Sequence, residues 1–466
     1  MKVDIAGFNI DSTLIKEASS LFAERADAFT PETLCASYAR ISRSKLDIGE
    51  LRRRALTEVE QARKANERIV FQMGHSSVSE HAVFNFDISN ISRLAVEYLQ
   101  SFRLTSFTEK SQRYVLFDEE FSVPEEIRGI GLADDFSLLM KRTATLYHQL
   151  YKELLSTGLE DEQAKEDARY ATGLASLTQM GMTVNARILE EIIVRLRNAP
   201  LKEVRDLAKG LLDSVKGLVP SLVKYTDADP YYREWYHQGP GDERAGKEST
   251  DGQDVELISF DIDGEERVLG ALMFQVSGKS VKALINDLSR VSEKERLRRL
   301  APIFRHMKPF HPLPRAFELA ALTFQIELSA TAFAQLKRHR MLTLLTSPYQ
   351  PALGHTVPPN ILKAGLEEML AEAVDQAENL YNRIRPHDLN AAGYALTNAN
   401  RRRVLVKVDV RELYHISRIR EDHHAQWDIR RIAGKMTAAA AKHYPLLMLM
   451  VGGKDRFPEI SRRVVG

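Results

Sequence analysis

The feature that most constrains the fold of this 466-residue chain is an internal duplication. The segment 3–10 reads VDIAGFNI and the segment 255–262 reads VELISFDI, so that Phe8 and Phe260 fall at the same place in two similar strand-like runs. Self-similarity over this distance indicates that one structural unit occurs twice along the chain. We therefore expect two similar copies of one unit.

The two copies contain matching segments in the same order. The matched pairs are 33–42 with 268–277, the basic helical segments 51–73 with 281–307, and the long helical patterns 134–157 with 362–384. Strands mixed with long helices predict the α+β class, with a small mixed sheet in each copy. The stretch 226–253 is rich in Asp, Gly, Pro and Tyr and has no helical or strand period, which indicates a linker. The predicted domains are 1–225 and 254–466.

Charge and cysteine content narrow the class of function. With 65 Lys and Arg against 64 Asp and Glu, the chain has no general positive field for nucleic acid, whereas a small anionic ligand is easily accommodated. The single cysteine, Cys35, which we place in an apolar strand, excludes an intrachain disulfide and a cysteine metal cluster. The start MKVDIAGFNI is not a charged leader, and the apolar run 444–451 is too short to span a bilayer. We expect a cytoplasmic protein with no membrane or nucleic-acid partner.

Two polar stretches, each preceded by an amphipathic helical pattern, carry the candidate site. The first runs from Arg93 to Tyr114, and its helix is expected to stop near Thr105, before a polar loop. The second, 334–351, begins in the same way. Hydroxyls, a carboxylate and guanidinium groups in such loops suit phosphate and sugar chemistry, although a solvated loop has the same composition. When the stretches are aligned on their arginines, each keeps residues that the other lacks.

Together the two stretches resemble the signature of the flavin-dependent thymidylate synthases, an Arg-His-Arg followed by Ser, Glu, Ser and Arg-Tyr at fixed spacings. The first copy supplies Arg103, Ser106, Glu109, Ser111, Arg113 and Tyr114, and the second supplies Arg338, His339 and Arg340. Gln335 also matches a nucleotide-contacting glutamine of the family, and Tyr98 stands at its place in the first copy. Neither copy is complete by itself.

The resemblance assigns flavin contacts in both copies. Residues 74–81 resemble a family segment that touches flavin, and residues 408–429 resemble the closing helix-loop-helix, in which Arg411, His415 and Arg418 share a helical face by their spacing. The implied flavin-binding residues are Ser42, His75, Ser77, Arg103, His339, Arg340, His415 and His424. For His75 alone, an ordinary surface or core histidine is the alternative interpretation.

The resemblance also assigns the nucleotide-binding residues, and these divide between the copies. The second copy retains Gln335, Arg338 and Arg420, and the first retains Glu109, Ser111, Arg113 and Arg169. Arg338, Arg420 and Ser111 are the implied catalytic residues. Family sites take ligands from two subunits along this same line, so we expect one composite site in the chain. The reciprocal site, where Gly393 replaces the early arginine, is expected to be lost. The resemblance further implies a homodimer of two-lobed chains that corresponds to the family tetramer.

A metal site built from Asp422, His423 and His424 is an alternative interpretation of the closing loop. We expect adjacent histidines to point in different directions, and no further Cys or His ligand is suitably spaced. The sequence therefore predicts no metal.

The resemblance implies an FAD-dependent methyltransferase that converts dUMP to dTMP by reductive methylation. Methylenetetrahydrofolate would give the carbon, reduced FAD a hydride, and NADPH would reduce the flavin. Since Cys35 matches no nucleophile, guanidinium groups would activate the uracil electrostatically. A nucleotide hydroxymethylase on the same scaffold remains an alternative. So does a non-catalytic flavin or nucleotide binder, because Thr343 replaces the serine that follows the triplet.

Overall fold

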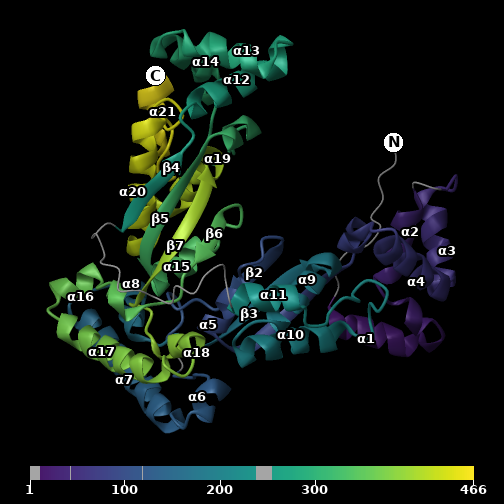
Figure 1. Cartoon of the computed structure of the whole chain (residues 1–466), viewed down its shortest axis with the longest axis horizontal. Coiled ribbons are helices and arrows are strands. Elements are labelled where there is room, and N and C mark those ends of the chain that lie inside the picture. Colours follow the sequence, from purple (N-terminus) through teal and green to yellow (C-terminus); the bar gives the residue numbers. More distant parts are fainter. Residues whose placement is uncertain (1–10, 42–43, 118, 238–253, 466) are drawn as a thin grey trace. The chain divides into compact units, whose positions relative to one another are not determined.

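A computed structural model of the chain describes residues 11–41, 44–117, 119–237 and 254–465 (Figure 1). It forms two compact units. Unit 1 comprises 1–111, 120–133 and 175–244, and unit 2 comprises 112–119, 134–174 and 245–466. Each unit combines one small sheet with several helices, which confirms the α+β class. Among the helices described, none has the length and apolar character needed to cross a membrane.

Unit 1 is organised around a three-stranded sheet with the order β1-β3-β2. The strands are β1 (Val83–Ser92), β2 (Thr105–Glu109) and β3 (Leu177–Asn185), and both pairings are antiparallel. In β3, Met180, Met182 and Val184 are buried while the residues between them are more exposed, which is the period of a strand with one core face. Both units have antiparallel pairings throughout their described strands, instead of the mixed sheets that were expected.

The helices of unit 1 correct three details of the sequence analysis. They are α1 (Ser12–Leu21), α2 (Glu32–Ile41), α3 (Ile48–Thr57), α4 (Val59–Glu67), α5 (Arg93–Leu99), α6 (Glu125–Gly129), α9 (Ala186–Arg197), α10 (Lys202–Val215) and α11 (Pro230–His237). Cys35 lies in α2 instead of a strand, and burial raises the pKa of its thiol to about 12. The helix expected to stop near Thr105 already ends at Leu99, and Thr105 begins β2. Helix α11 occupies part of the predicted linker. The predicted strand 3–10 lies outside the described residues.

Unit 2 has a four-stranded antiparallel sheet with the order β4-β5-β7-β6. The strands are β4 (Val255–Phe260), β5 (Ala321–Ser329), β6 (Thr343–Thr346) and β7 (Arg401–Asp409). Its helices are α7 (Ala133–Ser156), α8 (Asp161–Ala168), α12 (Gly264–Ser277), α13 (Val281–Ser289), α14 (Glu293–Phe304), α15 (Ala330–Leu336), α16 (Pro359–Lys363), α17 (Glu367–Ile384), α18 (Leu389–Ala392), α19 (Val410–Arg420), α20 (Trp427–His443) and α21 (Phe457–Val465). One core joins buried residues of β5, β7, α19 and α20, such as Phe324, Val406, Ile416 and Ile432.

The two sheets repeat one topology, as a duplication requires. In unit 1 the order is β1, α5, β2, then β3 and α9; in unit 2 it is β5, α15, β6, then β7 and α19. The helix starts are capped in the same way, by Ser92 and Ser329 before α5 and α15, and by Asn185 and Asp409 before α9 and α19. These side chains accept a backbone N–H of the first turn, which fixes where each helix begins.

The compact units differ from the predicted domains in one respect, because unit 2 includes residues 112–119 and 134–174 of the first copy. Apolar side chains of α7 and α8, such as Leu150 and Ala164, share a core with Leu370 and Val374 of α17. Backbone hydrogen bonds join the same segments, from Leu174 N to Leu396 O at 2.8 Å and from Asn398 N to Thr172 O at 2.9 Å. Unit 2 is therefore built from both copies.

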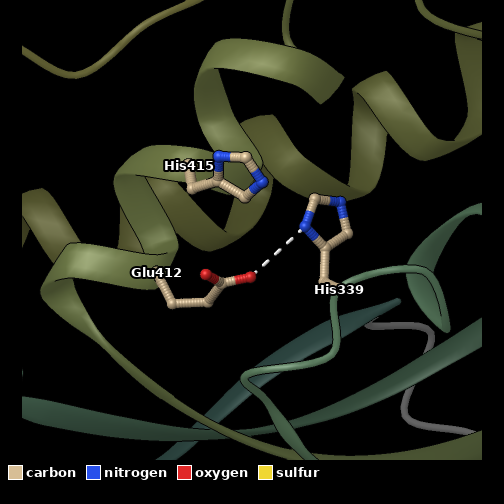
Figure 2. A group of neighbouring side chains, drawn as sticks. All are labelled: His339, Glu412 and His415. Atoms are coloured by element: carbon tan, nitrogen blue, oxygen red, sulfur yellow. Dashed lines mark ion pairs between the residues drawn. The ribbon is translucent and has the colours of Figure 1, made fainter. Parts of the chain in front are cut away.

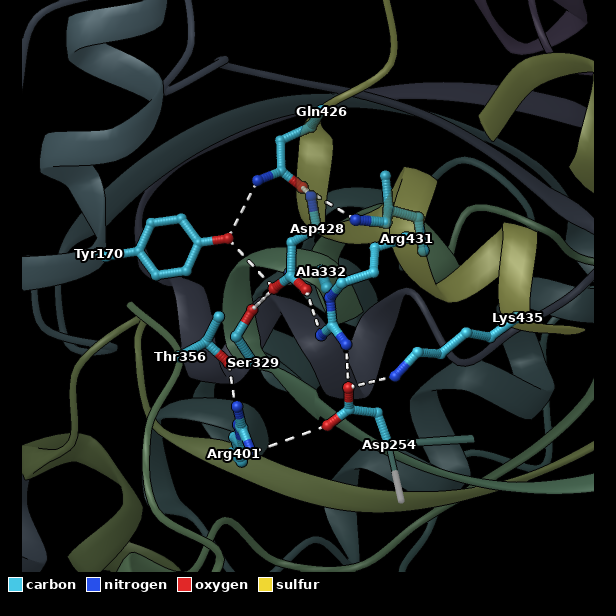
Figure 3. Close-up of polar contacts among 11 residues, drawn as sticks. Tyr170, Asp254, Ser329, Ala332, Thr356, Arg401, Gln426, Asp428, Arg431 and Lys435 are labelled. Atoms are coloured by element: carbon cyan, nitrogen blue, oxygen red, sulfur yellow. Dashed lines mark hydrogen bonds and ion pairs between the residues drawn. The ribbon is translucent and has the colours of Figure 1, made fainter. Parts of the chain in front are cut away.

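A buried polar cluster strengthens this junction (Figure 3). The Asp428 carboxylate accepts hydrogen bonds from the Tyr170 hydroxyl at 3.1 Å and the Ser329 hydroxyl at 2.6 Å. Arg431 donates to it at 2.9 Å, and Gln426 donates to the Tyr170 hydroxyl at 3.0 Å. Because a buried carboxylate without donors is costly, these bonds hold the start of α20 against Tyr170 of the first copy.

Candidate active site

The centre of the candidate site is the guanidinium group of Arg420, the last residue of α19. Its Nη1 donates to Gln335 Oε1 at 2.7 Å, its Nη2 to the Gln335 carbonyl at 3.1 Å, and its Nε to His339 Nε2 at 3.0 Å. Gln335 lies in the last turn of α15, and His339 follows the end of that helix. Arg420 is therefore hydrogen-bonded to two other residues that sequence analysis assigned to the site.

His339 is the most buried part of this arrangement and is held neutral. Burial, together with the nearby charge of Arg420, lowers the pKa of His339 to about 3. Its Nδ1 lies 3.4 Å from Glu412 Oε1, and its ring centroid lies 5.6 Å from that of His415 (Figure 2). Since Nε2 accepts from Arg420, the ring proton belongs on Nδ1, facing Glu412.

Two arginines of the first copy belong to the same unit. Arg113 forms an ion pair with Glu166 and donates to the His424 carbonyl at 3.2 Å. Arg169, just after α8, is buried, with 6% of its surface exposed, and donates from Nε to the Glu166 carbonyl at 3.2 Å. The Nη2 of Arg169 is buried and has no hydrogen-bond partner among the described residues. A buried cationic donor of this kind is costly unless a ligand satisfies it.

Electrostatic coupling indicates that these arginines lie near one another. Burial is the main cause that lowers the pKa of Arg420, to about 10, and the charges of Arg338 and Arg113 lower it further. Burial also lowers the pKa of Arg169, with an added contribution from Arg113. Arg113 is thus the common neighbour of an arginine from each copy. Several guanidinium groups around one place favour a ligand that carries negative charge.

Arg338 and Arg340 lie in unit 2, whereas the predicted site residues of the first copy other than Arg113 and Arg169 lie in unit 1 or outside the described residues. Glu109 accepts hydrogen bonds at 3.0 Å from Arg93 Nη1 and from Gln100 Nε2. His75, Ser77, Arg103 and Ser111 also belong to unit 1, and Ser42 is outside the described residues. The assigned roles of these residues stay predictions from the resemblance.

The loop between α19 and α20 differs from expectation in one detail. The rings of His423 and His424 do not diverge, because their centroids lie 3.6 Å apart. His424 Nδ1 is 2.9 Å from Asp422 Oδ1, and His423 Nδ1 is 3.3 Å from Asp455 Oδ2. The direction of adjacent side chains therefore gives no reason to exclude a metal here.

Sequence reasoning missed two carboxylates that organise the site, Glu166 and Glu412. Both lie in helices whose sequence gives them the appearance of ordinary surface residues. For Glu412, a signal was available in its position one turn before His415 on the face of α19 that the closing motif already marked.

Both copies of this chain match one family of known proteins. The sequence profile of the family described as thymidylate synthase complementing protein matches residues 26–221 and again residues 256–446. A flavin-dependent thymidylate synthase of Geobacter sulfurreducens is 32% identical over 206 residues, which cover 43% of this chain and 83% of that protein. The UPF0159 protein of Thermoplasma acidophilum is 28% identical over 443 residues, or 82% of this chain and 86% of that protein.

A similar solved structure covers less than half of this chain. A structure of flavin-dependent thymidylate synthase from Helicobacter pylori, complexed with FAD and dUMP, is 24% identical, with a TM-score of 0.32. The match covers 42% of this chain and 95% of that chain.

Proposed function

Since this chain belongs to the thymidylate synthase complementing protein family, we propose that it is a flavin-dependent thymidylate synthase with one composite site in unit 2. The reaction is reductive methylation of dUMP to dTMP, with methylenetetrahydrofolate as carbon donor and NADPH as reductant of the flavin. The members of the family named flavin-dependent thymidylate synthase support the activity, at 32% identity for the Geobacter protein.

The observation that carries the proposal is the buried Arg169 Nη2, which has no hydrogen-bond partner among the described residues. A nucleotide phosphate or a uracil oxygen is an acceptor that would satisfy it, and charge-assisted bonds of this kind are the strong ones. The charge of Arg113 lowers the pKa of both Arg169 and Arg420, which supports one nucleotide contacting arginines of both copies. Arg338 and Gln335 complete the proposed nucleotide site of unit 2. Glu109 and Ser111, which belong to unit 1, match nucleotide-binding residues of the family by resemblance alone.

Charge stabilisation is the chemistry that these residues supply. Attack on the reacting carbon of uracil builds negative charge on the ring oxygens, and fixed guanidinium donors in a partly dry site stabilise that charge. Arg420 is suited to this role because its orientation is fixed at three of its N–H groups. The buried Cys35, whose pKa is raised to about 12, is not a thiolate at neutral pH, which agrees with activation by charge alone.

The histidines of unit 2 are suited to holding FAD. His415 is exposed on α19 beside the buried His339, and His424 is exposed in the following loop. Imidazole rings offer both a flat face and hydrogen-bonding nitrogens, which fit a flavin ring and its polar edge. When bound, FAD would supply the hydride chemistry, and the protein would orient it and exclude water. We assign Arg340 to the same cofactor.

The test is the flavin and nucleotide content of the purified protein. We expect about one FAD per chain, because His339, His415 and His424 occur in one copy only, whereas two intact sites would hold two. The visible spectrum and the protein concentration together give the number of FAD molecules per chain. Calorimetric titration with dUMP measures binding of the nucleotide. Protein that binds neither would contradict the proposal.

Product analysis then separates the alternatives that use the same scaffold. With methylenetetrahydrofolate, NADPH and dUMP supplied, formation of dTMP supports the proposed reaction. A hydroxymethylated nucleotide would indicate a hydroxymethylase, and tight binding without turnover would indicate a non-catalytic binder.

A further inference from the structure

Glu412 occupies an unusual place, because it faces both His339 and His415, and His339 links it to Arg420. Glu412 lies in the first turn of α19, and its carboxylate is 3.4 Å from His339 Nδ1 (Figure 2). The opposite nitrogen of the same ring accepts from Arg420 Nε at 3.0 Å. Arg420 in turn donates hydrogen bonds to Gln335 from both terminal nitrogens. Four residues therefore form one chain of contacts from Glu412 to Gln335.

The direction of donation along these four residues depends on which nitrogen of the His339 ring carries the proton. With the proton on Nδ1, that N–H lies on the side of the Glu412 carboxylate, an electrostatic contact at 3.4 Å that is not a hydrogen bond, and Nε2 accepts from Arg420. With the proton on Nε2, two donors would face each other at 3.0 Å and Arg420 would have to turn away. A carboxylate on the Nδ1 side favours the first tautomer, in the way that a partner of one imidazole nitrogen commonly fixes the role of the other.

The same geometry argues against a metal at this place. The ligand atoms of His339, Glu412 and His415 lie within 4.8 Å of one another, close enough for an ion. A metal on His339 Nδ1 would require the proton on Nε2, where Arg420 already donates. The cationic Arg420 would also oppose a second cation nearby.

The internal duplication shows that the four residues change together. Counted from the matching N-caps, Gln335 and His339 correspond to Tyr98 and Phe102. Glu412 and Arg420 correspond in the same way to Ile188 and Leu196. Each of these four residues is thus replaced by an apolar or aromatic residue in the other copy. That pattern is expected if each member is useful only while the others are present.

We propose that Glu412 is a positioning residue for Arg420, and that it acts by holding His339 in the tautomer that accepts from the Arg420 guanidinium. Three of the five N–H groups of Arg420 are then engaged, which leaves two for the nucleotide. Naming dUMP as that nucleotide rests on the proposed function.

The experiment compares Glu412→Ile with Glu412→Gln in the full-length, FAD-loaded protein. Isoleucine is the residue at the equivalent place of α9 and keeps much of the volume, but it removes the acceptor. Glutamine keeps an acceptor oxygen for the Nδ1 proton. We expect Glu412→Ile to weaken dUMP binding by about tenfold in calorimetric titration, the size of the lost hydrogen bond between Arg420 and His339, and Glu412→Gln to restore it.

A second measurement reports on His339 directly and does not depend on dUMP. In protein labelled with nitrogen-15 at histidine, the His339 signals are identified by their loss in His339→Phe. We expect protonated Nδ1 in the wild type and in Glu412→Gln, and a mixture or protonated Nε2 in Glu412→Ile. Glu412→Ala serves as a second acceptor-free variant if isoleucine prevents folding.

The matched control is Glu421→Ala, which removes the carboxylate beside Arg420 that accepts from Thr437 at 2.9 Å but has no contact with His339. It is expected to leave both the tautomer and dUMP binding unchanged. An unchanged His339 tautomer in the acceptor-free variants would overturn the positioning role. Wild-type protein that shows the expected tautomer but binds no dUMP would instead contradict the proposed function.

Discussion

Helices α5 and α9 of unit 1 and helices α15 and α19 of unit 2 begin with equivalent caps, yet they present different chemistry. In unit 2, Arg420 of α19 reaches His339 and Gln335 beside α15. In unit 1, the Arg195 guanidinium lies 4.5 Å from the ring centre of Phe102, the residue at the place of His339. The same helix pair thus holds a polar site in one copy and an arginine stacked on an aromatic ring in the other.

Framework contacts are kept where ligand contacts are lost. Arg187 pairs with Glu80 at 2.5 Å in unit 1, and Arg411 pairs with Glu318 at 3.0 Å at the equivalent place in unit 2. Because these pairs join the start of α9 or α19 to the segment just before β1 or β5, they serve the fold in both copies. The difference teaches that the duplication kept its scaffold, while α5 and α9 lack the polar groups that α15 and α19 present at the equivalent places.

The strongest test of this comparison is removal of the arginines that only the working site uses. Arg169→Ala and Arg420→Ala should each weaken dUMP binding by about 1.5 to 3 kcal/mol, the range for hydrogen bonds to charged groups. Titration calorimetry measures the loss, and thermal melting checks the fold. Arg187→Ala is the matched control, since Arg187 is half-exposed and pairs with Glu80 in unit 1. If the control lost binding and Arg169→Ala kept it, the assignment of the site to unit 2 would be wrong.

A second test measures how the buried His339 makes stability depend on pH. In unit 1, Phe102 stands at the equivalent place and does not titrate. The folded pKa of His339, about 3, lies below the unfolded value near 6.5, so the unfolded chain binds the extra proton between these values. Stability should therefore fall as pH falls below about 6.5, by up to ~1.4 kcal/mol per pH unit. Replacing His339 with phenylalanine, the residue of unit 1, should remove about 2 kcal/mol of the loss between pH 7 and pH 5.

Urea unfolding followed by Trp427 fluorescence, in a Trp235→Phe background, measures this difference. Other buried histidines such as His355, whose pKa is also lowered by burial, contribute equally to both proteins. Equal pH slopes in the two proteins would show that His339 is not held neutral in the folded state.

A third test converts the polar chain of unit 2 into its apolar counterpart. Arg420→Leu alone leaves acceptors on Gln335 and His339 without their donor, which should cost about 1 to 2 kcal/mol of stability. Adding Gln335→Tyr, His339→Phe and Glu412→Ile should recover most of that cost, because well-packed apolar groups often replace a buried polar network without loss. Urea midpoints of the single and fourfold variants measure the recovery. Simple addition of four losses would mean that the residues are independent.

The sequence predicted much of the fold because duplication and periodicity are local signals. The long helix α7 and the repeated topology follow from them. Cys35 was misplaced because a short apolar run is compatible with either a strand or a buried helix. The exchange of 134–174 into unit 2 depends on core contacts between residues more than 200 positions apart, and no local pattern encodes these.

The candidate site was predictable only as far as a motif reached. Gln335, His339 and Arg420 came from family resemblance, and the structure joins them directly. Glu412 and Glu166 escaped, because a carboxylate on a helix has no motif of its own and its value depends on what it faces. Carboxylates that orient the residues of a site can therefore be recognised in the three-dimensional structure, but not from the spacing of residues in the sequence.

The smallest effect is expected where unit 1 keeps arginines that resemble site residues. Arg195 stacks on Phe102 and pairs with Glu191 at 3.2 Å, and Arg197 donates to the Thr226 carbonyl at 2.5 Å. Both therefore serve packing and loop anchoring in unit 1. The double variant Arg195→Ala/Arg197→Ala should lower stability by about 1 to 2 kcal/mol, through the lost cation–π contact and hydrogen bond, and leave dUMP affinity unchanged. Melting and calorimetry on the same preparation measure both values. Loss of dUMP binding in a folded double variant would show that unit 1 still contributes a nucleotide site and that the two copies differ less than their contacts indicate.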